Sequence, residues 1–115
     1  MLKERIEILK NGGVISQEVA DFVNHTIDVI VKDYPQVNED AAAMFTTHLA
    51  MAAERIRRGE VVEELDEAVW QDVVECPEYE TGCRLIEQLF ANQSVEFPES
   101  ERRFLMLHIC NMLSE

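Results

Sequence analysis

Two histidines stand out because each lies in an apolar stretch with helical periodicity. His48 falls within "FTTHLAMAAERIRRGE", residues 45–60, and His108 falls within "FPESERRFLMLHIC", residues 97–110. An imidazole can act as a base, a nucleophile or a metal ligand near neutral pH. A buried histidine more often only needs hydrogen-bond partners for its nitrogens. Packing is therefore the alternative interpretation of each ring.

Charged residues accompany both histidines at helical spacing. Arg55 follows His48 by seven residues, which is two turns or about 10 Å along one helix face. Helical side chains lean toward the N-terminus, so Arg55 is predicted to reach back toward His48, where its guanidinium could clasp phosphate oxygens. Glu101 precedes His108 by seven residues on the same face, and Arg102 follows that glutamate. This pattern indicates phosphate chemistry at the histidines.

The composition limits the classes of function. The chain has 115 residues, of which 47% are hydrophobic, enough for one compact domain with a core. Ten basic and 23 acidic residues give a net charge of −13, which disfavours direct binding of nucleic acid or of an anionic membrane surface. We find no signal peptide and no apolar run of membrane-spanning length. The odd cysteine count (Cys76, Cys83, Cys110) indicates reduced thiols, so we predict a cytoplasmic protein.

The N-terminal residues are expected to precede the main domain. Residues 2–10 fit two helical turns, and a flexible break follows at residues 11–13, "NGG". We therefore predict an N-terminal helical extension and turn over residues 1–15. The main helical domain is predicted to cover residues 16–115.

Capping signals divide the first half of that domain into two helices. Ser16 is a plausible N-cap, and the helix after it should end near Tyr34 because Pro35 disfavours helical geometry in the residue before it. Asn38 is expected to cap the second helix, and Gly59 follows its end. The predicted buried stripe of this second helix comprises Met44, Phe45, His48, Leu49, Ala52 and Ile56.

The second half is predicted to add three more helices. They cover residues 62–75, residues 78–91 and a last segment with Pro98 in its first turn. The last helix is apolar on nearly every side, which is typical of a central helix or of a subunit interface. Short connections favour antiparallel neighbours, so the predicted fold is all-α, a compact antiparallel bundle of about five helices.

The two histidine segments together resemble the PTS regulation domain, or PRD, of bacterial regulators controlled by the sugar phosphotransferase system. The resemblance covers nearly the whole chain, from about residue 16 to residue 113. The first family motif is matched by His48, Arg55, Arg57, Arg58 and Gly59. The second is matched by Pro98, Glu99, Glu101, Leu107, His108 and Ile109. Thr47 stands where the family often has Asp, and Arg103 stands where it often has a small residue.

The resemblance implies a helical bundle that forms a homodimer and needs no cofactor. It implies that His48 and His108 take phosphoryl groups from the carrier HPr or from EIIB-type proteins, with Arg55, Glu101 and Arg102 as supporting residues. Phosphorylation adds nearly two negative charges, enough to bias a two-state arrangement of subunits. The chain looks like a stand-alone PRD, whose output would act through a partner protein on transcription or metabolism.

Three other interpretations of these residues are a zinc site, an enzyme and a structural adaptor. A zinc site formed from the cysteines and His108 is disfavoured, because their spacing does not match a zinc motif. An enzyme is disfavoured, because there is no glycine-rich phosphate loop and no distinct carboxylate pair. A structural helical adaptor, in which both histidines serve only for packing, is the serious rival. His25 belongs to no family motif and is predicted to be structural or partly exposed.

Overall fold

The computed structural model describes residues 2–60, 64–91 and 97–114. Within these residues the chain forms helices and no strands, so the all-α prediction is confirmed. The described part contains six helices, which are the five of the main domain and the N-terminal helix over residues 2–11, where two helical turns were expected. The helices are α1 (Leu2–Asn11), α2 (Gln17–Asp33), α3 (Glu39–Arg57), α4 (Glu67–Val74), α5 (Tyr79–Phe90) and α6 (Glu99–Ser114).

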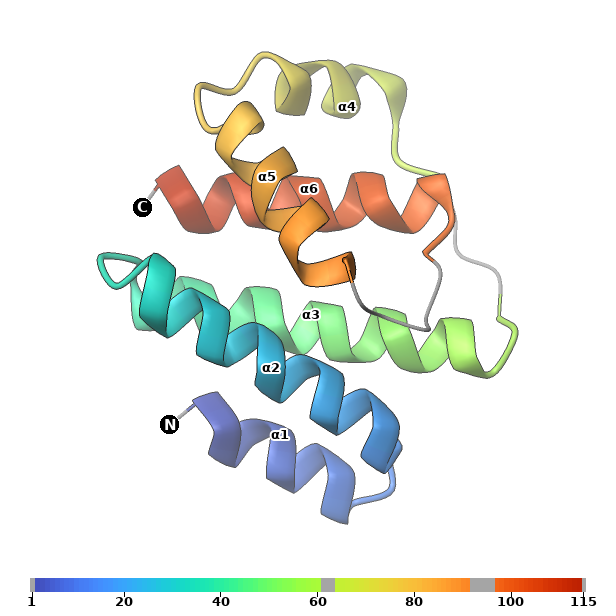
Figure 1. Cartoon of the computed structure of the whole chain (residues 1–115). Helices are drawn as coiled ribbons and strands as arrows, with labels where there is room; N and C mark the ends of the chain where they lie inside the picture. The colour runs from blue at the N-terminus through green and yellow to red at the C-terminus, as the bar shows by residue number, and fades with distance from the viewer. Residues whose placement is uncertain (1, 61–63, 92–96, 115) are drawn as a thin grey trace.

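Four of the helices run alternately up and down. In Figure 1, α1, α2 and α3 follow one another in antiparallel fashion, and α6 returns along α3 in the opposite direction. Helix α4 packs on α6, while α5 crosses α6 steeply and ends near α2, where Phe90 stacks on Phe22. The two helices that carry the motif histidines, α3 and α6, are therefore direct neighbours in space.

The predicted helix boundaries in the first half are confirmed. The Ser16 hydroxyl accepts a hydrogen bond from the backbone N–H of Val19 at 3.2 Å, and α2 ends just before its C-cap Tyr34. The Asn38 side chain accepts from the backbone N–H of Asp40 at 2.8 Å. Gly59 follows α3 with a φ of +74°, a conformation that favours glycine.

Two boundaries in the second half differ from the prediction. The helix predicted over residues 62–75 starts later, at Glu67, because Asp66 is non-helical and its carboxylate accepts from the backbone N–H of Ala68 at 2.8 Å. Residues 64–66 are therefore not helical, and the part of the prediction that falls on residues 61–63 lies outside the described residues. Helix α6 begins immediately after Pro98 rather than at it.

The buried face of α3 differs in membership from the predicted stripe, and Ile56 is only half-buried. Phe45, Leu49 and Ala52 are buried as expected. Met44, however, has 61% of its surface exposed, and His48 is also exposed. Alanines fill the additional buried positions of α3, because they allow neighbouring helices to approach closely; these are Ala42, Ala43, Ala50 and Ala53. His48 thus lies at the solvent edge of α3 and not in its buried row.

Close packing fixes α6 between its neighbours. Gly82 of α5 faces α6 so closely that a Cβ atom there would lie 2.9 Å from Cε of Met106 and 3.0 Å from Cγ2 of Ile109. A side chain at this position would force the Met106 and Ile109 side chains to shift, so Gly82 allows the close approach of α5 to α6. At the other end of the bundle, Ile6 of α1 is fully buried in the same core. The position of α6, and with it the position of His108, is set by packing on both sides.

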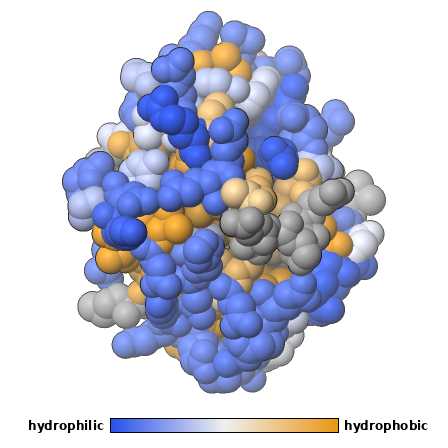
Figure 2. All heavy atoms as spheres, in the orientation of Figure 1, coloured by the Kyte–Doolittle hydropathy of each residue, from blue (hydrophilic) through white to orange (hydrophobic). Residues whose placement is uncertain are grey.

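The face of the molecule seen in Figure 2 is largely polar. Hydrophilic residues cover most of it, and hydrophobic atoms show in patches between them. Among the helices of the described part of the chain, none is both long and apolar enough to span a membrane.

Candidate functional site

The two motif histidines lie in direct contact. The His48 ring from α3 and the His108 ring from α6 stack face to face, with ring centroids 3.9 Å apart and planes inclined by 9°. His48 is exposed and His108 is half-buried. Sixty residues of chain separate them, and the antiparallel packing of α3 on α6 brings them together.

A pocket of about 240 Å³ opens beside the stacked rings. It is lined by His48, Ala52, Arg55, Glu101, Phe104, Leu105 and His108. Four of the five site residues predicted from the sequence are thus gathered in one place. Phe104 and Leu105 were not predicted as site residues, and Ala52 was predicted only as a buried position. The signal for Phe104 was available, because it precedes His108 by one helical turn on the same face.

The charged pair of the pocket consists of Arg55 and Glu101. Nη2 of Arg55 lies 3.4 Å from Oε1 and 3.5 Å from Oε2 of Glu101, which are long distances for such a pair. The Glu101 side chain is 1% exposed, whereas that of Arg55 is 38% exposed. Nε of Arg55 is buried without a hydrogen-bond partner among the described residues. The guanidinium therefore holds the buried carboxylate loosely and retains a free donor.

The surroundings of His108 keep its ring uncharged. Burial and, to a smaller extent, the neighbouring His48 ring together lower the pKa of His108 to about 4. At neutral pH the His108 imidazole is therefore neutral, and one of its nitrogens carries a free lone pair. A neutral imidazole nitrogen is a nucleophile, so this ring suits a reaction that forms a bond to nitrogen.

The fifth predicted site residue, Arg102, lies elsewhere. Its Nε donates to the backbone carbonyl of Phe97 at 3.1 Å, and its guanidinium lies 5.2 Å from the centre of the Phe90 ring. It does not line the histidine pocket. Arg103 also points away, with Nη1 3.2 Å from Oε2 of Glu67. On a helix, residues adjacent to Glu101 point to other faces, which explains the separation.

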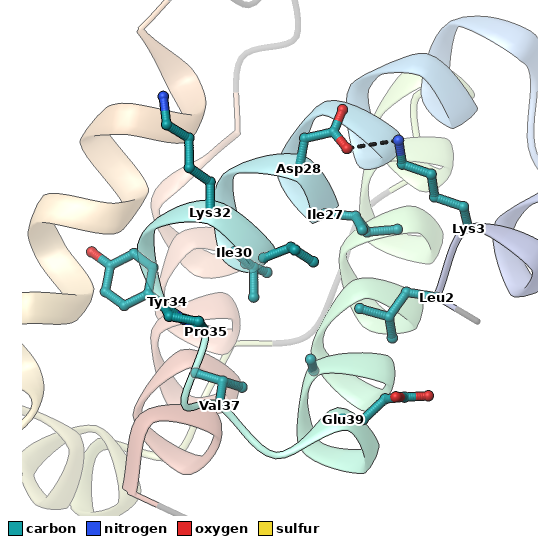
Figure 3. A pocket seen from close by; sticks show the side chains of 12 residues that line it. Leu2, Lys3, Ile27, Asp28, Ile30, Lys32, Tyr34, Pro35, Val37 and Glu39 are labelled. Carbon is teal, nitrogen blue, oxygen red and sulfur yellow. Dashed lines mark ion pairs between the residues drawn. The ribbon is translucent and has the colours of Figure 1, made fainter.

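A larger pocket occupies a different part of the molecule. It measures about 610 Å³ and is formed by α1, α2 and the start of α3. Figure 3 shows apolar side chains such as Leu2, Ile27 and Val37 around it, with Lys3 and Asp28 joined by a 2.6 Å ion pair at its edge. None of its lining residues lines the histidine pocket. The larger pocket could hold a ligand by its shape, but none of its lining residues is a histidine.

Metal binding finds no support in the described part of the chain. No group of three or more His, Cys, Asp or Glu side chains there is arranged to hold a metal ion. The three cysteines, Cys76, Cys83 and Cys110, are free thiols. The arrangement of the histidine pocket instead matches nitrogen nucleophiles beside an arginine that could bind phosphate oxygens.

Comparison with known proteins decides the family. The family model described as "PRD domain" matches residues 20–111, which is most of the chain. The chain belongs to the PRD domain family. Both stacked histidines and the Arg55–Glu101 pair fall inside the matched region of this PRD.

One curated relative shares most of its length with this PRD protein. It is the "Uncharacterized protein YhfY" of Escherichia coli (strain K12), which is 23% identical over 109 residues, covering 94% of this chain and 91% of the relative. No solved structure matches the chain.

Proposed function

We propose that this PRD protein is a phosphohistidine switch that reports the state of the sugar phosphotransferase system to a regulatory partner. His48 and His108 are the proposed acceptors, and HPr or EIIB-type proteins are the proposed donors. The observation that carries the proposal is the stacked pair: the two motif histidines, from different helices, share one solvent-accessible pocket. Membership of the PRD family supports a role connected with this system.

With HPr as the donor, the proposed reaction moves a phosphoryl group between imidazoles. A lone pair on a neutral acceptor nitrogen attacks the phosphorus of the donor phosphohistidine, and the new N–P bond forms as the donor's N–P bond breaks. The donor imidazole leaves with the bonding electrons and takes up a proton, while the acceptor ring loses the proton on its other nitrogen. The lowered pKa of His108 favours its role as acceptor, because the ring keeps a free lone pair at pH 7.

The negative charge of a phosphoryl group could separate the loosely held Arg55–Glu101 pair. A phosphoryl group carries up to two negative charges and attracts a guanidinium more strongly than one carboxylate does. Arg55 would turn toward it, and the buried Glu101 would lose its cationic partner. An uncompensated buried charge is strongly destabilising, so the packing of α6 on α3 would have to adjust. In this way a local charge would change the relation between two helices.

Phosphorylation is proposed to act on a partner by changing a protein–protein contact surface. Next to the outer side of His108 is a hollow of about 130 Å³, and the exposed Met44 lies at its rim, one turn before His48. We propose that a homodimer forms over this part of α3 and α6, so that phosphorylation alters how two copies meet. A net charge of −13 argues against direct contact with nucleic acid, so the output would pass to a partner regulator. Free thiols are in line with the proposed cytoplasmic location.

A structural adaptor without phosphorylation is the second candidate. The stacking of His48 on His108 favours it, because two flat rings in contact are also a good packing unit. The adaptor predicts the same fold and the same dimer. It differs from the switch in one respect, which is that neither imidazole reacts.

Phosphorylation in a reconstituted system separates the two candidates. The purified protein is incubated with phosphoenolpyruvate, Enzyme I and either HPr or a panel of EIIB proteins, and its intact mass is measured at alkaline pH. The switch predicts an acid-labile phosphate on the wild-type protein and none on the double variant His48→Ala/His108→Ala. A protein that gains no phosphate from any donor supports the adaptor. A double variant that is phosphorylated as fully as the wild type would exclude the two proposed acceptors.

A further inference from the structure

We propose that phosphorylation of His48 and phosphorylation of His108 exclude one another, so that the pocket carries one phosphoryl group at a time. This inference rests on the proposed function and specifies how its site is regulated. It starts from the contact between the two rings, whose centroids are 3.9 Å apart in nearly parallel planes. That separation is van der Waals contact, and it leaves no room for solvent between the faces.

The charges of the pocket oppose a second phosphoryl group. Each group brings about 1.5 to 2 negative charges at neutral pH. Arg55 is the one lysine or arginine among the described residues that line the pocket, and it already faces the buried carboxylate of Glu101. One phosphoryl group can take over this guanidinium. A second group on the adjacent ring would find no cation of its own and would face both the first group and Glu101.

Distance makes this repulsion large. Groups attached to two rings in contact lie within about one Debye length of each other, so salt screens their repulsion poorly. Partial burial of His108 lowers the local dielectric constant and strengthens the interaction further. In addition, a phosphoryl group on His48 would favour the protonated form of His108, in which both nitrogens carry protons and no lone pair remains to attack phosphorus.

With mutual exclusion, the domain would respond to one phosphoryl donor at a time. If one donor prefers His48 and another prefers His108, the first to act would block the other. The domain would then report which donor acted, and it would not add the two signals. The N–P bond formed and the N–P bond broken are the same as in the proposed reaction, so no further reactant is needed.

The test compares phosphate stoichiometry across matched variants. The wild-type protein, His48→Ala, His108→Ala and the control His25→Ala are each driven to saturation with phosphoenolpyruvate, Enzyme I and the active donor, and intact masses are recorded at alkaline pH. His25 is a suitable control because it is exposed on α2, away from the pocket. If an alanine variant is misfolded by circular dichroism, His48→Gln or His108→Gln replaces it.

Exclusion predicts one phosphate on each single-histidine variant and still one on the wild type and on His25→Ala. The doubly phosphorylated wild-type protein should be at least about tenfold rarer than the product of the two single-site occupancies, the value for independent sites. A wild type that carries two phosphates at that independent level overturns the exclusion and leaves the phosphohistidine switch intact. A single variant that takes no phosphate identifies one acceptor only, and this also overturns the exclusion. A complete absence of phosphate on all proteins overturns the proposed function itself.

Discussion

Among the residues that the structure describes, two glutamates are buried, and their hydrogen-bond partners differ strongly in number and distance. Glu54 is 3% exposed and accepts four hydrogen bonds, from the backbone N–H of Ser16 at 3.0 Å, twice from Arg57 at 2.8 and 3.2 Å, and from Arg58 at 2.8 Å. Glu101 is 1% exposed and faces a single guanidinium nitrogen of Arg55 at 3.4 and 3.5 Å. The first carboxylate is saturated, and the second is loosely held beside two histidines.

This difference distinguishes the structural contacts of Glu54 from the histidine pocket, where the Arg55–Glu101 pair can be separated. Glu54 ties the end of α3 to the start of α2, and its partners lower its pKa to about 2, chiefly through the Arg57 hydrogen bonds. The loose pair in the histidine pocket has nothing comparable to hold it in place. A site that must answer to an added charge needs such a partner that can be released, and Arg55 is suited to that role.

Neutralising each carboxylate should give the largest and most unequal effect. Glu54→Gln is expected to lower the free energy of unfolding by about 2–3 kcal/mol, because it removes charged hydrogen bonds from a buried position. Glu101→Gln should change it by less than about 1 kcal/mol, because a neutral amide avoids the cost of a poorly compensated buried charge. Urea denaturation of both variants at pH 7 measures the two values. A larger loss for Glu101→Gln than for Glu54→Gln would contradict the distinction between the regions.

As the pH falls, His108 and Glu54 should lose their contributions to stability in different pH ranges. His108 has a folded pKa of about 4, below its ordinary value of 6.5, so the folded state binds fewer protons than the unfolded state between these values. Its contribution to stability is complete above pH 6.5 and is lost as the pH falls toward 4. Glu54 contributes fully above pH 4.5, and that contribution is lost as the pH falls toward about 2.

Between pH 7 and pH 5 the wild-type protein should therefore lose about 1 kcal/mol of stability on account of His108, after allowance for screening of this half-buried ring by solvent. His108→Gln should lack that part of the loss, and Glu54→Gln should retain it. Urea midpoints at the two pH values provide the measurement. An identical pH dependence in wild type and His108→Gln would show that the ring is not held neutral by its surroundings.

The smallest expected effect on stability belongs to Arg55. Arg55→Gln should lower the free energy of unfolding by less than about 1 kcal/mol, because the Arg55 side chain is 38% exposed, its contacts are long, and the Gln amide still offers Glu101 an N–H donor, which the turning of Arg55 toward a phosphoryl group would take away. Its effect on the phosphorylated protein should be larger, because the guanidinium is the proposed partner of the phosphoryl group. We expect phosphorylation to shift the dimer dissociation constant of the wild type but not that of Arg55→Gln, as measured by analytical ultracentrifugation. An equal shift in both proteins would argue against this role of Arg55.

Local signals in the sequence were enough to predict most of the helices. Ser16, Asn38 and Gly59 act as the caps that their types indicate, and Pro35 follows the end of α2. These features depend on neighbours within a few residues. The start of α4 was predicted too early, because the capping residue Asp66 lies inside a run of acidic residues with no glycine or proline to mark the helix start.

The site was only partly predictable, because its contacts are long-range. The family resemblance paired His48 with His108, but nothing local shows that their rings would stack. Helical spacing pointed Arg55 toward His48, and its actual partner, Glu101, lies 46 residues away on another helix. Glu54 was missed for the same reason. Its burial depends on the N–H of Ser16, which lies 38 residues away in the sequence.

Nitrogen-resolved NMR of histidine tests most directly whether these two rings are the acceptors. The protein is labelled with ¹⁵N at histidine, and long-range proton–nitrogen spectra are recorded before and after incubation with phosphoenolpyruvate, Enzyme I and a donor. We predict that the imidazole nitrogen signals of His48 or His108 move to positions typical of phosphohistidine, while those of His25 stay in place. Spectra in which the His48 and His108 signals are unchanged by every donor would contradict a phosphoacceptor role for the stacked pair.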